Sequence, residues 1–189
     1  VLAYLKHTPE RGITYSRRVD LPDNFNRLYL FVDATCADDK TDRKSTSGII
    51  CMLNGGPVSW KSKKQPIIAQ SSCEAEIIAA TAGANEAAFL RDLLEEIGCT
   101  QVPTRCYEDN QACRMIIENP GSLRERSKHF EIRFLKVAEY AQRGVINAVQ
   151  IPTKWQLADL LTKRVSPARH RFLCDLLLGT TFFNHQLYD

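Results

Sequence analysis

Short apolar runs separated by polar turns dominate the first third of the chain. The run LYLFV at 28–32 is flanked by polar residues. A run of this length is typical of a buried strand, which we expect to cover residues 28–36. Two further stretches, 49–53 and 58–61, are separated by Asn54-Gly55-Gly56-Pro57. Asn and Gly favour tight turns, so the two stretches are predicted to form a β-hairpin.

Helical spacing takes over further along the chain. Apolar residues recur at helical intervals from 72 to 98, and Gly98 favours the end of a helix. Beyond it the pattern predicts, in order, a strand at 104–108, helices at 110–118 and 128–142, a strand at 145–151, and a last helix from Pro167 to 178.

This order of elements indicates an α/β fold. A hairpin-connected start followed by strands that alternate with helices predicts a mixed sheet, antiparallel first and parallel later. Ligands of such sheets gather at the carboxyl ends of the parallel strands, and Asp109 follows one of them. Residues 1–8 have helical spacing and 9–27 suit a connecting segment, so the core domain is expected to begin near 28.

Length and composition are consistent with one globular domain. The chain has 189 residues, of which 44% are hydrophobic and 25% charged. No stretch approaches the roughly 18 apolar residues of a membrane span. Because the first residue is Val, we expect a fragment of a longer protein.

The net charge of +3 is too small to indicate a nucleic-acid partner, but the basic residues are clustered. The clusters are Lys61, Lys63 and Lys64; Arg124, Arg126, Lys128, Arg133 and Lys136; and Lys163, Arg164, Arg169 and Arg171. Each could equally be an ordinary solvated face.

Seven cysteines are scattered along the chain without a C-x-x-C pair or a Cys/His cluster of zinc spacing. An odd number with this distribution favours reduced thiols and an intracellular location.

Asp33 is the most informative acidic residue. It lies inside the predicted buried strand, where an ionised carboxylate is costly unless a cation or hydrogen bonds compensate it. A purely structural role is the less favoured alternative. We therefore expect a compensating partner for this carboxylate.

Glu76 lies near the start of the long predicted helix. Ser71 and Glu74 have the spacing of a capping box, which gives Glu74 a structural role. Glu76, in the second turn, has no such local role and is a candidate for a function.

Asp109 and Asp159 each have an ordinary alternative. Asp109 could cap the helix expected at 110, and Asp159 could be a solvent-facing helix residue. Thr153 and Gln156 have capping-box spacing for the helix that carries Asp159.

Taken together, the four acids predict a metal centre. Hard oxygen ligands from separate elements suit magnesium or manganese. Two such ions roughly 3.5–4 Å apart clamp a phosphodiester, with a bridging carboxylate such as Asp33 between them. The residue pattern therefore indicates a two-metal nuclease.

Six ordered motifs resemble the ribonuclease H domain of copia-type LTR retrotransposon Pol polyproteins. They are DRKSTSG (42–48), GGPVSWKSKKQP (55–66), SSCEAE (71–76), EDNQAC (108–113), SKHFEIRF (127–134) and IPTKWQLADLLTK (151–163). The resemblance covers roughly 28–165, and residues 1–15 are similar to the tail of the preceding reverse transcriptase. It implies three parts: a connecting segment at 1–27, the ribonuclease H domain at 28–165, and a C-terminal helix and tail at 166–189.

The resemblance also implies a fold, a site and partners. The fold is ribonuclease H-like, a five-stranded mixed sheet with helices on both faces. The metal ligands and catalytic acids fall on Asp33, Glu76, Asp109 and Asp159, and substrate contacts on Ser71, Ser72, Asn110 and Gln111. The cofactors are two Mg²⁺ ions, with Mn²⁺ as a substitute. The partners are an RNA–DNA hybrid and the reverse transcriptase of the same polyprotein, in cytoplasmic virus-like particles or the nucleus.

Departures from the family pattern keep other hypotheses open. Cys36 and Asp38 replace the usual Trp and Gly after the first acid, and Ile77 replaces a Tyr. A catalytically silent module that binds nucleic acid or supports a reverse transcriptase is the second hypothesis. A DNA nuclease of the same fold, such as an integrase or resolvase, is the third. His129 is expected to be structural, with a substrate contact as the alternative.

Overall fold

The protein is built around a mixed five-stranded sheet. The computed structural model describes residues 2–16, 26–36, 41–119 and 128–181, with the backbone alone for 128–134. The strands are β1 (Leu28–Ala34), β2 (Thr46–Leu53), β3 (Gly56–Lys64), β4 (Thr104–Glu108) and β5 (Ile146–Gln150). Their order is β3-β2-β1-β4-β5, in which β1 to β3 pair antiparallel and β4 lies parallel to both β1 and β5. The predicted mixed sheet is confirmed.

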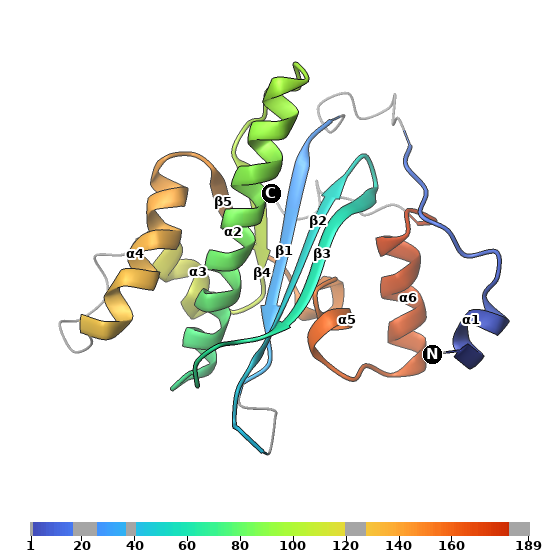
Figure 1. Cartoon of the computed structure of the whole chain (residues 1–189), viewed down its shortest axis with the longest axis horizontal. Helices are drawn as coiled ribbons and strands as arrows, with labels where there is room; N and C mark the ends of the chain where they lie inside the picture. Colours follow the sequence, from blue (N-terminus) through green and yellow to red (C-terminus); the bar gives the residue numbers. More distant parts are fainter. Residues whose placement is uncertain (1, 17–25, 37–40, 120–127, 182–189) are drawn as a thin grey trace.

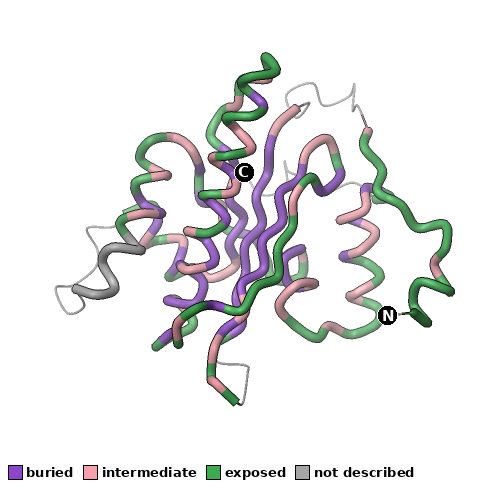
Figure 2. The backbone as a smooth tube through the Cα atoms, in the orientation of Figure 1, coloured by how far each residue is buried: buried purple, intermediate pink, exposed green. Residues whose placement is uncertain are grey.

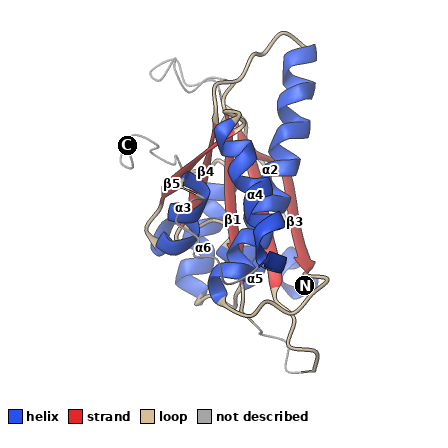
Figure 3. Cartoon of the chain, turned by 90° about the vertical axis from the view of Figure 1, so that its left-hand side faces the viewer, coloured by secondary structure: helices blue, strands red, loops and turns tan. Residues whose placement is uncertain are grey.

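Helices cover both faces of the sheet (Figures 1 and 3). The helices α2, α3 and α4 lie on one face, and α5 and α6 on the other. The helical elements are α1 (Leu2–His7), α2 (Ser72–Glu96), α3 (Gln111–Glu118), α4 (Lys128–Gln142), a 3₁₀ turn η3 (Thr153–Trp155), α5 (Asp159–Thr162) and α6 (Pro167–Leu177). Among the described residues, no helix is long and apolar enough to cross a bilayer.

The central strand β1 is buried along its whole length (Figure 2). Its side chains alternate between two hydrophobic clusters. Leu30 and Val32 pack with residues of α2, whereas Tyr29 and Phe31 pack with residues of α6. A strand covered on both faces needs apolar residues at every position, which explains the uninterrupted apolar run.

The β2–β3 hairpin turns at Asn54 and Gly55, whose φ angles are +51° and +83°. Two successive positive φ values are the requirement of a type I′ hairpin turn. The strands are longer than predicted, because pairing continues to Thr46 opposite Lys64. β3 is an edge strand, and an edge strand tolerates exposed lysines that break the apolar pattern.

Side-chain caps begin α2 and α3, and Ser166 caps α6 in the same way. The Ser71 side chain accepts a hydrogen bond from the Glu74 N–H at 3.1 Å, which confirms the predicted cap of α2. The Glu74 carboxylate accepts from the N–H of Gln70. The helix α3 is capped by Asn110, whose side chain accepts from the Cys113 N–H at 3.1 Å. Asp109 is therefore not the cap of this helix.

The predicted capping box of Thr153 and Gln156 is wrong. Thr153 belongs to the 3₁₀ turn, and α5 begins at Asp159 with no side-chain cap. The Gln156 side chain is fully buried and donates instead to the Val32 carbonyl at 2.9 Å. A tertiary hydrogen bond in the core thus replaces the local one.

The two ends of the described chain contact each other. Arg11 forms an ion pair with Asp175 of α6 at 2.9 Å, and the Thr14 N–H donates to the Leu178 carbonyl at 2.8 Å. Helix α6 also contributes Leu173 to the second hydrophobic cluster. The helix that follows the predicted boundary at 165 therefore packs directly on the sheet.

Candidate metal centre

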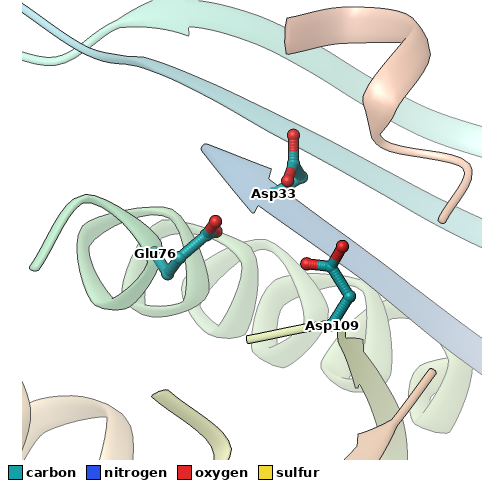
Figure 4. A group of neighbouring side chains, drawn as sticks. All are labelled: Asp33, Glu76 and Asp109. Carbon is teal, nitrogen blue, oxygen red and sulfur yellow. The ribbon is translucent and has the colours of Figure 1, made fainter. Parts of the chain in front are cut away.

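Three of the four predicted acids converge at one edge of the sheet (Figure 4). Asp33, Glu76 and Asp109 each offer a carboxylate oxygen, and these oxygens all lie within 4.8 Å of one another. Asp33 and Glu76 are buried, whereas Asp109 is half-buried. The group is therefore accessible to solvent mainly at Asp109.

Sheet topology brings Asp33 and Asp109 together. Asp33 lies near the carboxyl end of β1, and Asp109 directly follows β4. Because β1 and β4 are parallel neighbours, their carboxyl ends share one edge of the sheet.

Glu76 is positioned by the close packing of α2 on β1. A Cβ atom at Gly83 would lie 2.6 Å from Cγ1 of Val32, so only glycine permits this approach. Seven residues are about two helical turns, so Glu76 lies on the same face of α2 as Gly83. This face brings the Glu76 carboxylate to the end of β1.

Without a bound cation, the ionised form of Glu76 is strongly disfavoured. Burial, together with the neighbouring carboxylates, of which Glu108 contributes most, raises the pKa of Glu76 to about 10. The buried Oε2 atom of Glu76 has no hydrogen-bond partner among the described residues. An unsatisfied carboxylate oxygen beside two further acids fits the coordination of a divalent cation.

Glu108 is a fifth acid of this region that the sequence analysis missed. It is fully buried at the end of β4, and burial raises its pKa to about 8. Its Oε1 accepts from the Asn110 N–H at 2.9 Å, and within the described chain its Oε2 is unsatisfied. Glu108 could have been identified by the criterion applied to Asp33, because it too is an acidic residue within a strand expected to be buried.

The compensation expected for Asp33 is present. Lys163 Nζ donates to Asp33 Oδ1 at 2.8 Å, and the Thr162 hydroxyl donates to Asp33 Oδ2. Both donors come from the end of α5, which packs so closely on β2 that a Cβ at Gly48 would lie 2.7 Å from Thr162. The sequence did not identify Thr162 or Lys163 as a partner of Asp33, because both lie some 130 positions away from it.

Asp159 lies beside this group but is not one of its three members. It is 1% exposed, so the solvent-facing alternative is wrong. Lys163 donates to its Oδ1 at 2.8 Å, and Arg169 of α6 donates to its Oδ2. Its role as a metal ligand stays a prediction.

The predicted substrate residues flank the acids along the chain. Ser71 and Ser72 are exposed at the start of α2, and Gln111 is exposed at the start of α3. Asn110 is half-buried and caps α3. Their contact with a substrate stays a prediction.

Some sequence predictions lie outside the described residues. These are the side chains of His129, Arg124, Arg126, Lys128 and Arg133, together with Asp38. In the basic cluster on β3, Lys61 pairs with Glu86 and Lys64 with Asp42. All seven cysteines are free, as expected.

Comparisons with known proteins relate the chain to retrotransposon polyproteins. It is 35% identical over 167 residues to the retrovirus-related Pol polyprotein from transposon RE1 of Arabidopsis thaliana, and 35% over 150 residues to that from transposon TNT 1-94 of Nicotiana tabacum. These matches cover 88% and 79% of this chain and 11% of each relative. No protein-family model matches the chain.

Ribonucleases H are among the solved structures with a similar fold. LC11-RNase H1, isolated from compost by a metagenomic approach, superposes with a TM-score of 0.56 at 15% identity, covering 73% of this chain and 94% of that one. Its crystal structure in complex with an RNA/DNA hybrid gives a TM-score of 0.54 at 15% identity, covering 71% and 93%. At this identity the likeness shows the fold alone. The chain corresponds to a region of the Pol polyproteins of copia-type retrotransposons, and this region has the ribonuclease H-like fold.

Proposed function

We propose that this domain is a metal-dependent endonuclease that cuts the RNA strand of RNA–DNA hybrids. The observation that carries the proposal is the convergence of Asp33, Glu76 and Asp109 within 4.8 Å at the carboxyl edge of the sheet. The solved complex of LC11-RNase H1 with an RNA/DNA hybrid supports the choice of substrate. In the parent polyprotein the task is removal of the RNA template during reverse transcription.

The chain's own residues would hold the ions and orient the substrate. When bound, two divalent ions would activate a water for attack and stabilise the leaving 3′ oxygen, so that the products would be 5′-phosphate and 3′-hydroxyl ends. Asp33, Glu76 and Asp109 are the residues that hold the ions, with Asp159 as the fourth ligand. Asp109 is half-buried whereas Asp33 and Glu76 are buried, so Asp109 is the most accessible of the three acids.

Substrate recognition falls to the polar and basic groups around this edge. Ser72 and Gln111 are exposed there and can donate to phosphate or 2′-hydroxyl oxygens. Contacts to the 2′-hydroxyl would give selectivity for RNA, and basic side chains would give affinity for phosphates. The partner domain is the reverse transcriptase of the same polyprotein.

A hybrid-cleavage assay tests the proposal. The protein is incubated with a 5′-labelled RNA–DNA hybrid and Mg²⁺, beside double-stranded RNA and DNA of the same sequence. Asp109→Asn should lower the rate at least about 100-fold, because even outer-shell partners of a metal site are worth 10–100-fold. Asp92→Asn, which removes an exposed carboxylate of α2, is the matched control and should cleave like the wild type.

A silent module is the second candidate, favoured by the protein donors that already occupy both oxygens of Asp159. Hybrid binding without cleavage by the wild type at any Mg²⁺ or Mn²⁺ concentration would support it. Full activity of Asp109→Asn would instead show that the acids are not the catalytic group.

A further inference from the structure

Lys163 holds two acids of the site together. Its Nζ lies 2.8 Å from Oδ1 of Asp33 and 2.8 Å from Oδ1 of Asp159. Asp159 and Lys163 lie one helical turn apart at the two ends of α5, where the Lys163 N–H donates to the Asp159 carbonyl at 2.9 Å. The ammonium group therefore bridges a carboxylate of the central strand and one of the short helix.

The Asp33–Asp159 pair differs from the rest of the site in its donors. Besides Lys163, Thr162 donates to the second oxygen of Asp33, and Arg169 donates to the second oxygen of Asp159. Each of the four oxygens thus has a protein donor. In contrast, Glu76 Oε2 has none among the described residues. Protein cations therefore compensate Asp33 and Asp159, but they leave Oε2 of Glu76 without a donor in the described part of the chain.

Burial decides which of these groups can move. The side chains of Asp33 and Asp159 are 0% and 2% exposed, whereas that of Lys163 is 38% exposed. A lysine has a flexible four-carbon stem, so its ammonium can turn into solvent while the carboxylates stay in place. An ammonium and a divalent ion in contact with the same oxygens would repel each other strongly.

We propose that Lys163 is an internal cation that competes with a divalent ion for the position between Asp33 and Asp159, whereas the Asp33–Glu76–Asp109 group offers two further carboxylates, Glu76 and Asp109, to which Lys163 does not donate. The two ion positions of the site then have unequal affinities, and Lys163 sets the difference. This inference rests on the metal centre of the proposed function, but not on cleavage.

Ion titration of the full chain tests the proposal without nucleic acid. Mg²⁺ and Mn²⁺ are titrated by calorimetry into the wild type, Lys163→Met and Lys163→Arg. Lys63→Met is the matched control, since Lys63 is an exposed lysine of β3 whose loss changes the net charge equally. The wild type and Lys163→Arg should bind one ion clearly more tightly than a second.

Lys163→Met should tighten the weaker site by about tenfold or more, a change that Lys63→Met should not reproduce. Without ions, Lys163→Met should also melt at a lower temperature than the wild type and gain more from saturating Mg²⁺, because Asp33 loses its cation and Asp159 keeps only Arg169. Should it not fold, Lys163→Gln is titrated in its place.

Identical isotherms for the Lys163 variant, Lys63→Met and the wild type would overturn the proposal. This result is separate from a failure of the proposed function. If the wild type binds ions but cuts no hybrid, the proposed function fails while the ion titrations still test Lys163. If the wild type cuts the hybrid but Lys163→Met binds ions as the wild type does, only the role of Lys163 is refuted.

Discussion

Gly83 sets the distance between α2 and the central strand, and Gly83→Ala should therefore weaken both the fold and the metal centre. The new Cβ would lie 2.6 Å from Cγ1 of Val32, about 0.8 Å short of the ordinary contact limit of 3.4 Å. The same Cβ would lie 3.2 Å from Cδ1 and 3.3 Å from Cδ2 of Leu30. Val32 is fully buried and β-branched, so it cannot turn away.

Two opposing effects determine the size of the change. Overpacking of a tight core costs about 1–3 kcal/mol, and the rigid surroundings favour the upper end. Replacing Gly by Ala within a helix gains about 1 kcal/mol. We expect a net loss of about 1–2 kcal/mol in the free energy of unfolding. Because α2 carries Glu76, its displacement should also lower Mg²⁺ affinity.

Urea denaturation and Mg²⁺ calorimetry measure the two effects. Gly12→Ala is the control, since a Cβ there meets nothing within 4 Å; it should change stability by less than about 0.5 kcal/mol. The double variant Val32→Ala/Gly83→Ala should lose less stability than the sum of its single variants. A Gly83→Ala protein that is more stable than the wild type and binds Mg²⁺ equally well would refute the reasoning.

Two further predictions concern charge and hydrogen bonding in the core. Without divalent ions, the folded state raises the pKa of Glu76 to about 10 and that of Glu108 to about 8. The stability linked to these two protons is fully present below pH 4.5, and it is lost as the pH rises through the raised pKa values. Urea midpoints should therefore fall between pH 5 and 10, with a shallower slope for Glu76→Gln; an unchanged slope in that variant would count against the assignment. Gln156→Ala should cost about 1–3 kcal/mol, because the Val32 carbonyl loses its buried donor. A melting temperature equal to that of the wild type would show that water replaces the amide.

Several parts of the site could be predicted from local sequence alone. Asp33 stands out because a charge in an apolar run needs compensation, and the structure supplies it through Lys163 and Thr162. The cap formed by Ser71 was predictable because its partner, Glu74, lies three residues away. Each of these inferences depends on spacing along the chain or on the cost of burying one group.

Other parts depend on residues that are distant in sequence. The spacing of Thr153 and Gln156 predicted a local cap, but Gln156 donates to a strand 124 positions away. Glu108 has the sequence position of an ordinary strand end, and only its complete burial in the fold distinguishes it. Arg169 and Lys163 were counted as members of a basic cluster, although both contact the buried Asp159.

The sequence by itself determined the order of strands and helices, the mixed character of the sheet, and the identity of the acids worth testing. These follow from hydrophobic periodicity and from the cost of burying charge, which are properties of short segments. The tertiary structure alone decided which acids meet and which cations they meet. Those distances depend on how β1, α2 and α5 pack, as at Gly83 and Gly48, and such packing between distant segments has no local signature.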